Sequence, residues 1–572
     1  MLDKIEKQLK KLLKKTGVTG EFEFGRPPKS GMGDIAFACF GFAKEQKKNP
    51  AEVAKEIAEK LKLKISKSKL FDRVEAFGPY VNFYLNTSEL TRLTLVKVAK
   101  KDFGKNNFGK GKKVLIEYPS QNTHKEFHIG HLRNVCIGNC LVELYKKSGY
   151  DITAINYVND FGRHVVKVLW YILRSQKSKV QNPKLITNKQ KWLGEIYAEA
   201  SAYIAEHKEE VAPELDELQK KLESRDPEVM KLFEETRQWS IDGFAKIMDE
   251  LEVDHNKIIY ESEIKDRGQK IVDDLLDKKI AMVGEGGAII IDLQKYNLDI
   301  ALLRKSSGAG LYLTSDLALA EKKFTDFSVN ESINITGTEQ NHYFQQLFKV
   351  LWLYGFQHKM THIGYGLVNL PSGKMSSRAG NVILYEDLRD EVFEKLKKET
   401  CRRHETWGEE KINNNTQILT MAVLKFSMQK HESNKVVTFD MAEALSFDGY
   451  SAPYVLYAVA RINSLLAKSK IVIKKMKFDF SLVKEEEEKK ILLLIADYDN
   501  VIKKALADYN PSVIARYCFE LAQAFNDFYN RHSVLGGENK DLQLIRLALS
   551  KAVKDVLTSA LSILTIDTVE EM

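Results

Sequence analysis

The sequence predicts a multidomain protein of the α/β plus α class: a small α+β domain, a doubly wound parallel-sheet domain and a helical bundle, in that order. Its 572 residues, 44% of them apolar, are enough for about three or four separate cores. Residues 114–158 read as strand, helix and strand, which is the unit of a parallel sheet. Residues 416–572 show almost only helical periodicity.

The first domain is expected at residues 1–105, where a helical pattern at 51–63 and an apolar strand at 80–85 indicate an α+β unit. The Lys-rich N-terminus places its apolar residues at helical spacing, which is typical of an amphipathic first helix. An organelle transit peptide is the alternative, but Asp3 and Glu6 argue against it because such peptides are poor in acidic residues. A linker rich in Gly, Asn and Lys is expected to follow.

The second domain is expected at residues 112–410 and begins with the strand Val114–Tyr118, the helix Ile129–Lys147 and the strand Thr153–Val158. This order predicts a Rossmann-like parallel sheet. A highly charged helical stretch and a short strand-like segment follow, so a helical insertion is expected at about residues 165–292.

The alternation of strand and helix then resumes. Strands are expected at 333–336 and 363–368, on either side of an amphipathic helix at 343–354. Residues 415–572 are expected to form the helical bundle. The acidic run Glu485–Glu488 within it is expected to be a solvated helix face.

The composition argues against several classes of protein. No stretch approaches the roughly 20 apolar residues of a membrane helix, and the N-terminus lacks the apolar core of a secretory signal, so we expect a cytoplasmic protein without a membrane partner. Five scattered cysteines without a CxxC pair indicate neither a disulfide framework nor a zinc site, and Cys136 and Cys140 are expected to be small buried residues. The charge balance of 87 basic and 79 acidic residues, a net +8, permits a polyanionic partner without proving one.

His128, Ile129, Gly130 and His131 lie between the first strand of the sheet and its helix. Unpaired N–H groups at the helix start, a glycine that allows close approach and two imidazole donors would suit a phosphate. Taken alone, these four residues are weak evidence, because a pair of histidines in a loop is more often surface decoration.

A second motif follows about 240 residues later: Lys374, Met375, Ser376, Ser377 and Arg378, set between two glycines after a predicted strand. A loop lysine could neutralise charge as pyrophosphate leaves, although a lone basic loop is usually only solvated surface. In this order and spacing the pair resembles the HIGH and KMSKS signatures of class I aminoacyl-tRNA synthetases. The resemblance implies that His128, His131 and Lys374 are catalytic, and that these residues bind ATP together with Gly130, Met375, Ser376 and Ser377.

The stretch from Glu117 to Asn122 narrows the resemblance to the arginyl enzymes. It is similar to their signature ahead of HIGH, with Gln121 where the family commonly has proline. The resemblance implies that Ser120 and Asn122 hold the amino and carboxylate groups of arginine with help from His131, and that Glu117 lies near the substrate.

The run from Gly310 to Asp316 resembles the segment with which that family holds the guanidinium group, so Tyr312 and Asp316 are implied as its contacts, with Gln340 as a further polar contact. A carboxylate and an aromatic face suit a planar guanidinium. The alternative is a helix-start aspartate beside a half-buried tyrosine. Tyr157 and Asp160 are assigned to the site only by their likeness to a family segment.

Both ends of the chain resemble the RNA-binding parts of the same family. Residues 78–83 look like the N-terminal domain that contacts the tRNA elbow, which makes Tyr80, Asn82 and Phe83 candidate contacts unless they fill the core of the domain. Tyr454, Tyr457 and Arg461 fall on one face of a helix at the start of a domain that resembles the anticodon-binding bundle. That face is either core or an anticodon contact.

The resemblance as a whole implies an ATP-dependent arginine–tRNA ligase. Arginine is activated to arginyl-adenylate and then transferred to the 2′-hydroxyl of the terminal adenosine of tRNA(Arg). The expected partners are L-arginine, ATP with Mg²⁺ and tRNA(Arg), acting on a monomer without protein-bound zinc or any other metal site. Two rivals remain: a class I synthetase for another amino acid, which the set Tyr312, Asp316 and Gln340 disfavours, and a silent paralogue that only binds RNA.

Overall fold

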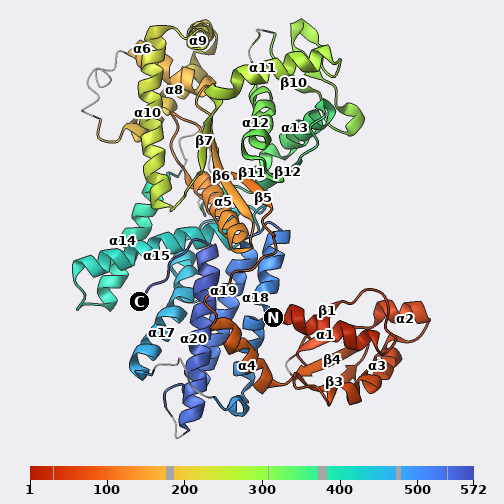
Figure 1. Cartoon of the computed structure of the whole chain (residues 1–572). Helices are drawn as coiled ribbons and strands as arrows, with labels where there is room; N and C mark the ends of the chain where they lie inside the picture. The colour runs from red at the N-terminus through yellow and green to blue at the C-terminus, as the bar shows by residue number, and fades with distance from the viewer. Residues whose placement is uncertain are drawn as a thin grey trace.

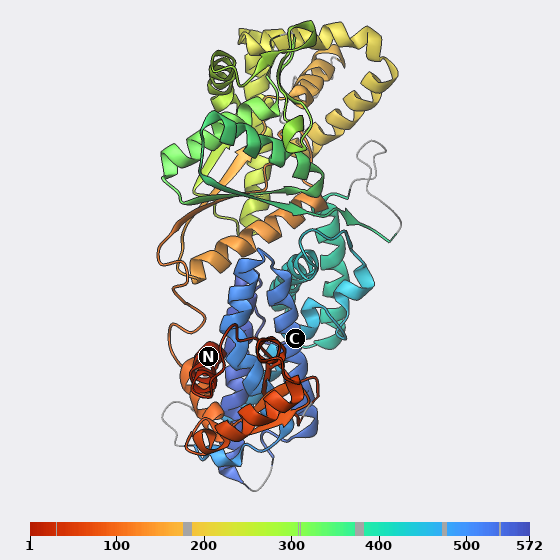
Figure 2. The ribbon, with the colours of Figure 1, turned by 90° about the vertical axis from the view of Figure 1, so that its right-hand side faces the viewer.

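The computed structural model describes residues 1–572 except 30, 176–185, 307, 309, 372–382, 472–477 and 537–538. Its parts form an elongated molecule, with the parallel sheet at the centre, a helical insertion at one end and the C-terminal bundle at the other (Figures 1 and 2). The N-terminal domain lies beside the bundle, against which helix α1 (Leu2–Lys14) and helix α4 (Thr87–Val98) pack.

The N-terminal domain is an antiparallel sheet in the order β1-β2-β4-β3, covered by helix α3 (Pro50–Ile65). Strand β4 (Tyr80–Leu85) has the predicted bounds because its apolar run is buried between two neighbouring strands. The remaining elements are β1 (Phe24–Gly25), β2 (Ile35–Ala38), α2 (Phe40–Gln46) and β3 (Phe71–Phe77).

The central sheet has five parallel strands in the order β12-β11-β5-β6-β7, which confirms the predicted fold class. Its strands are β5 (Lys113–Glu117), β6 (Asp151–Val158), β7 (Lys257–Tyr260), β11 (Glu331–Gly337) and β12 (Lys359–Tyr365). Alternate residues of β5 face opposite sides, so the run Val114–Ile116 is buried on both. Val114 and Ile116 join the core shared with α5 (Ile129–Lys147), whereas Leu115 joins the core of α11, α12 and α13.

Helices α6, α8, α9 and α10 form the insertion, and the sheet resumes with β7 at Lys257, inside the range in which the insertion was expected. A separate small antiparallel sheet, β10-β9-β8, lies between α11 and α12 in the chain. The bounds are α6 (Arg163–Ser175), α8 (Lys189–Glu206), α9 (Lys208–Glu223), α10 (Pro227–Glu250), α11 (Glu261–Asp277), β8 (Met282–Val283), β9 (Ile289–Ile291), β10 (Ala301–Arg304), α12 (Tyr312–Phe327) and α13 (Asn341–Tyr354).

The C-terminal bundle packs α17, α18, α19 and α20 against one another, and α14 and α15 lead into it from the sheet domain. The bounds are β13 (Val368–Asn369), α14 (Tyr385–Arg403), α15 (Glu409–Gln429), β14 (Val437–Thr438), α16 (Met441–Leu445), α17 (Ala452–Ser469), α18 (Glu486–Ala507), α19 (Ser512–Arg531) and α20 (Lys540–Ile563). Cys136 and Cys140 are buried, as expected. No helix among the described residues is long and apolar enough to cross a membrane.

Arg133 joins helix α5 to the junction between the sheet domain and the bundle. Its side chain is fully buried, and its two Nη atoms donate hydrogen bonds to five backbone carbonyls. The acceptors are Gly366, Leu367, Glu432, Ser433 and Lys435. Strands β13 and β14 pair at the same place, through Val368 and Val437. The two Nη atoms therefore hold two chain segments together, while Nε of Arg133 has no hydrogen-bond partner.

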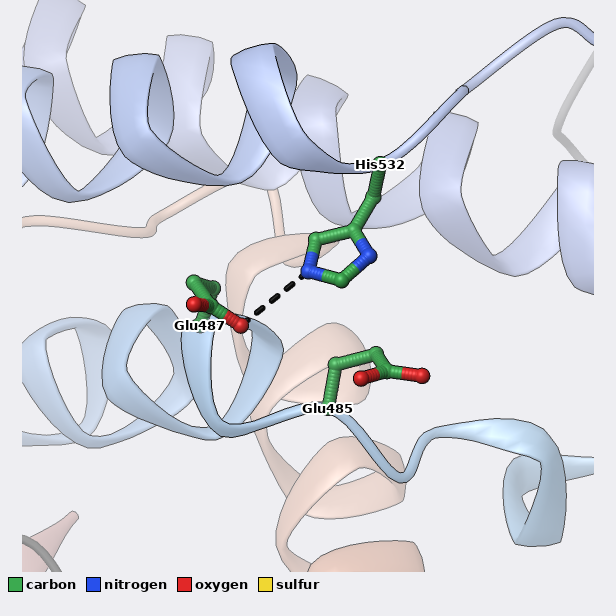
Figure 3. Close-up of side chains that lie close together, drawn as sticks. All are labelled: Glu485, Glu487 and His532. Atoms are coloured by element: carbon green, nitrogen blue, oxygen red, sulfur yellow. Dashed lines mark hydrogen bonds and ion pairs between the residues drawn. The ribbon is translucent and has the colours of Figure 1, made fainter.

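The acidic run at the start of α18 is exposed at Glu485 and Glu486, as expected, but the expectation of a solvated face is wrong for Glu487 and Glu488. Glu488 is 1% exposed and accepts a hydrogen bond of 2.8 Å from Nε of Arg546. Glu487 lies 3.0 Å from Nε2 of His532 at the end of α19 (Figure 3). It also pairs with Arg531. The acidic start of α18 therefore ties two helices of the bundle together.

Candidate active site

His128 and His131 form a compact unit at the N-terminus of α5, just beyond the C-terminal end of β5. Nδ1 of His128 accepts the backbone N–H of Gly130 at 3.1 Å, and Nδ1 of His131 accepts the backbone N–H of His128 at 3.3 Å. The two rings stack with centroids 3.8 Å apart. A Cβ on Gly130 would lie 2.9 Å from the His128 ring, so only glycine fits beneath it.

Both imidazoles are neutral at pH 7. Burial, and secondarily the charge of Lys125, lower the pKa of His128 to about 4, and burial holds the pKa of His131 well below its usual value. Because each Nδ1 accepts a hydrogen bond, each neutral ring carries its proton on Nε2. The pair therefore offers two N–H donors rather than two cations.

Lys374, Met375, Ser376 and Ser377 lie outside the described residues. The chain is described again from residue 383, and there it lies beside the first motif. Ile129 donates its backbone N–H to the carbonyl of Ile383 at 3.1 Å, and His128 bridges to Leu384. Ile383 and Leu384, which follow the second motif in the sequence, thus lie beside the helix start that carries the two histidines.

The loop from Glu117 to Asn122 is tied to the neighbouring strand. Asn122 forms a parallel bridge with Asn159 beyond the end of β6, and the carbonyl of Gln121 accepts the backbone N–H of Asn159 at 3.2 Å. Gln121 itself is 2% exposed. Glutamine in place of the usual proline is therefore accommodated in a loop held by backbone pairing, with Ser120 and Asn122 left half-buried.

Glu117 is buried at the end of β5 and forms an ion pair with Lys323 of α12, a residue to which no role was given from the sequence. The hydroxyl of Ser120 donates to the other carboxylate oxygen at 3.4 Å. Glu117 therefore already has partners beneath the Ser120 loop.

Asp316 lies on the first two turns of α12, where its carboxylate accepts a hydrogen bond from the hydroxyl of Tyr343 on α13. Burial raises the pKa of Asp316 to about 7, although that hydrogen bond lowers it and the charge of Glu117 raises it further. Tyr312, the first residue of the same helix, is 59% exposed. A desolvated carboxylate beside an accessible aromatic ring is the arrangement expected for a cation site.

Glu261, the first residue of α11, is a second carboxylate at this place that the sequence analysis missed. It is buried, one of its oxygens has no hydrogen-bond partner, and the other accepts from the hydroxyl of Ser315 at 3.3 Å. Burial, with the negative charge of Asp316 next in size, raises its pKa to about 7. Glu261, Tyr312 and Ser315 line a cavity of about 590 Å³ that continues toward the insertion.

The other candidate site residues of the sheet domain differ in the surroundings of their side chains. The hydroxyl of Tyr157 is buried without a partner, and the charge of Asp316 contributes to the rise of its pKa, so Tyr157 lies close to Asp316. Asp160 is fully buried and bonded to Arg237 at 2.6 Å and to Ser262, which is a structural arrangement. Gln340 is exposed at the N-cap of α13, less than one turn before Tyr343.

The three candidate residues of the N-terminal domain differ in how far their side chains are exposed. Tyr80 is 39% exposed and packs edge-on against the exposed ring of Phe40, with centroids 5.7 Å apart. Phe83 is fully buried and Asn82 is 4% exposed. Phe83 therefore fills the core of the domain, and Tyr80 presents the accessible ring.

The candidates of the bundle share one half-buried surface. Arg461 donates to Asn526 at 2.8 Å and lies over the rings of Tyr457 and Tyr529 at 4.7 and 4.8 Å. Tyr454, one turn before Tyr457, contacts Phe519 with ring centroids 5.3 Å apart. These side chains are partly packed into the bundle and partly accessible.

Comparison with known proteins covers the whole chain. Three family models match in order: the N-terminal domain of arginyl-tRNA synthetases at residues 1–85, the catalytic domain of class I arginyl-tRNA synthetases at 93–440 and the DALR anticodon-binding domain at 455–572. The arginine–tRNA ligases of Clostridium botulinum strain Alaska E43 and Clostridium beijerinckii are 34% and 35% identical, each over 96% of this chain and 95% of the relative.

Solved structures agree in fold. The arginyl-tRNA synthetase of Thermus thermophilus superposes over 100% of both chains with a TM-score of 0.83 at 24% identity. The arginyl-tRNA synthetase of Plasmodium falciparum superposes over 99% of both chains with a TM-score of 0.80 at 19% identity. Because the catalytic-domain model alone spans more than half of the chain, this protein belongs to the family of class I arginyl-tRNA synthetases.

Proposed function

We propose that the arginine side chain binds between Tyr312, Asp316 and Glu261, and that its amino and carboxylate groups bind at Ser120 and Asn122. The observation that carries the proposal is the pair of desolvated carboxylates, Asp316 and Glu261, of which Glu261 lines the cavity together with Tyr312. A guanidinium group presents planar donors that can satisfy both, and its charge would return them to their ionised form. Gln340 is proposed as a further polar contact at the same edge.

The reaction of the family is the ATP-dependent activation of arginine to arginyl-adenylate, followed by transfer to the 2′-hydroxyl of the terminal adenosine of tRNA(Arg). The substrate carboxylate attacks the α-phosphate itself, so no protein nucleophile is needed and the protein contributes positioning and charge stabilisation. We assign the Nε2–H groups of His128 and His131 to phosphate oxygens, with Gly130 allowing the nucleotide to approach the backbone. Lys374 and its neighbours Met375, Ser376 and Ser377 are proposed to close on the triphosphate.

Magnesium enters as part of the ATP substrate. Within the described residues, the His, Cys, Asp and Glu side chains that converge closely enough for a metal ion are Glu485, Glu487 and His532, which lie in the bundle and not at the active site. Mg²⁺ keeps several waters and binds mainly to phosphates when carboxylates are few. The site therefore fits MgATP held through its nucleotide.

Transfer RNA is proposed to contact both ends of the chain, at Tyr80 of the N-terminal domain and at Tyr454, Tyr457 and Arg461 of the bundle. Accessible aromatic rings next to a guanidinium group suit unpaired bases, which stack without regard to sequence. We expect a monomer to carry both contacts, and sedimentation of the free protein would measure this.

The deciding experiment is the charging of unfractionated tRNA with each standard amino acid in turn. Arginine alone should be attached, and only when ATP is present. Attachment of lysine at a comparable rate would contradict the proposed pocket, because a compact ammonium group cannot satisfy two carboxylates and a stacked ring together. Tyr80→Ala should raise the KM for tRNA while leaving the KM for arginine unchanged.

A further inference from the structure

Lys323 is buried to an unusual degree for a lysine. Its side chain is 1% exposed, and it lies on α12 seven residues after Asp316, two turns along the same helix face. A lysine is almost never fully buried unless it is paired, because the loss of hydration costs several kcal/mol. Its partner is Glu117, whose side chain is 5% exposed at the end of β5.

The ion pair is not needed to attach α12 to the sheet domain. Leu313, Leu317, Leu319 and Ala320 of the same helix are already buried in the apolar core. A buried ion pair gives little or no net stability compared with apolar side chains of the same size. A role beyond packing would account for two charges in this position.

The pair connects the two halves of the proposed arginine pocket. Glu117 accepts from the hydroxyl of Ser120, which lies in the loop proposed to hold the substrate amino and carboxylate groups. Lys323 shares its helix face with Asp316, which is proposed to hold the guanidinium group. The charge of Lys323 therefore acts on both ends of the substrate site.

We infer that Lys323 is a positioning residue for arginine recognition: its ammonium group fixes the Glu117 carboxylate under the Ser120 loop and balances its charge, which leaves Asp316 to face the guanidinium group. The inference rests on the arginine pocket proposed above. Without Lys323, two carboxylates would compete for protons in one desolvated site, and the Ser120 loop would lose the fixed acceptor beneath it.

Charged and titratable groups reach Asp316 from five elements. They are Glu117 of β5, Tyr157 of β6, Glu261 of α11, Lys323 of α12 and Tyr343 of α13. Lys323 is the cation of this set, and it lowers the pKa of Asp316 whereas Glu117 raises it. Removal of Lys323 should therefore move the ionisation of Asp316, and the arginine affinity that depends on it, to higher pH.

The test uses four variants of the full chain: Lys323→Met, Lys323→Arg, Glu117→Gln, and Lys323→Met combined with Glu117→Gln. Lys322→Met is the matched control, because this neighbouring lysine of α12 is 34% exposed and pairs with Asp326 on the surface. The KM values for arginine and for ATP are measured in tRNA charging between pH 6 and pH 9, together with the thermal unfolding midpoint.

Lys323→Met should raise the arginine KM at least about tenfold and shift its pH dependence upward by about one unit, while the ATP KM changes less than about twofold. Lys323→Arg should restore most of the arginine affinity. The double variant should resemble Glu117→Gln, because it leaves no unpaired charge. Lys322→Met should behave like the parent.

The proposal is overturned if Lys323→Met loses thermal stability but keeps the arginine KM and its pH dependence, or if the arginine and ATP KM values rise together. Should Lys323→Met not fold, the double variant decides, and a parental arginine KM in it would overturn the inference. The variant Asp316→Asn tests the proposed arginine pocket independently of the role of Lys323. If Asp316→Asn raises the arginine KM and the Lys323 variants do not, only the role of Lys323 is lost.

Discussion

Two buried charged sites in this protein are built in opposite ways. At the junction beneath α5, the guanidinium group of Arg133 donates to five backbone carbonyls and needs no counter-ion. Around Asp316 the carboxylates are desolvated, and an oxygen of Glu261 and the hydroxyl of Tyr157 have no partner. Buried polar groups are normally paired. The junction therefore compensates its charge with backbone carbonyls, although Nε of Arg133 has no partner, whereas the desolvated carboxylates around Asp316 have the pattern that we propose for a site that takes a cationic ligand.

If the two sites differ in this way, the largest effect on arginine binding is expected on substitution of Asp316. Asp316→Asn keeps the size of the side chain but removes the charge that would face the guanidinium group. Loss of one side of such a pair costs about 2 to 5 kcal/mol, so the arginine KM should rise roughly 30-fold to several thousand-fold, with the ATP KM near the parental value. Charging rates at saturating ATP and tRNA measure this. A helix-start aspartate would instead cost about 1 kcal/mol of stability and leave the arginine KM unaltered.

Arg133 should show the reverse pattern. Arg133→Met leaves several buried carbonyls without a donor, and each costs about 1 to 3 kcal/mol unless the site relaxes, so a loss of about 2 to 4 kcal/mol is expected. Urea unfolding would measure it, with Arg133→Lys intermediate because it keeps the charge and fewer donors. The arginine KM of the folded fraction should not change. A large change in arginine KM with an unchanged unfolding midpoint would show that the two sites do not differ as argued.

The pocket should also respond to pH. Asp316 and Glu261 have pKa values raised to about 7, so the free protein holds these protons more tightly than the unfolded chain does. Its stability is therefore highest below their unfolded pKa values and falls as pH rises through about 7. Arginine, which binds the ionised form, should bind roughly tenfold or more tightly at pH 8 than at pH 5.5.

Thermal unfolding with and without arginine measures this linkage. The rise in midpoint caused by saturating arginine should be larger at pH 8 than at pH 5.5. Combining Asp316→Asn with Glu261→Gln should remove the difference, whereas Arg133→Lys should retain it. An equal rise at both pH values in the parent protein would contradict proton-linked binding.

The sequence predicted the elements whose apolar pattern is long. The helix at Ile129–Lys147 and the strand Tyr80–Leu85 have the expected bounds, and both are buried along most of their length. Strand β7 was not predicted because it has only four residues, of which Lys257 and Ile258 are exposed. Too few residues alternate there for a period to be recognised.

The prediction of site residues from the sequence was limited in the same way. The motifs around His128 and Asp316 could be recognised because their residues are adjacent in the chain. Lys323 and Glu261 could not, since their chemistry depends on groups far away in sequence: Glu117 for one and Asp316 for the other. A signal existed for Glu261, which directly follows β7 at the carboxyl edge of a parallel sheet, where ligands bind. That signal could not be used, because strand β7 was not predicted from the sequence pattern.

The smallest effect is expected at the start of α18, where neighbouring glutamates differ mainly in burial. Glu487 is 17% exposed and pairs with His532 (Figure 3). It also pairs with Arg531, whose side chain is 68% exposed. The hydrogen bond from His532 is the main cause that lowers the pKa of Glu487 to about 2. The stability that the ionised Glu487 contributes is therefore present above its unfolded pKa and is lost as pH falls toward 2.

Solvent screens such a cluster, so Glu487→Gln should cost less than about 1 kcal/mol at pH 7. Glu488→Gln is the matched reference, because it removes one side of a fully buried pair with Arg546 and should cost about 3 kcal/mol or more. Unfolding midpoints at pH 7 compare the two, and neither variant should change the arginine KM. Equal losses would mean that burial does not decide the energetic weight of a charge in this protein, and the contrast between junction and pocket would need another cause.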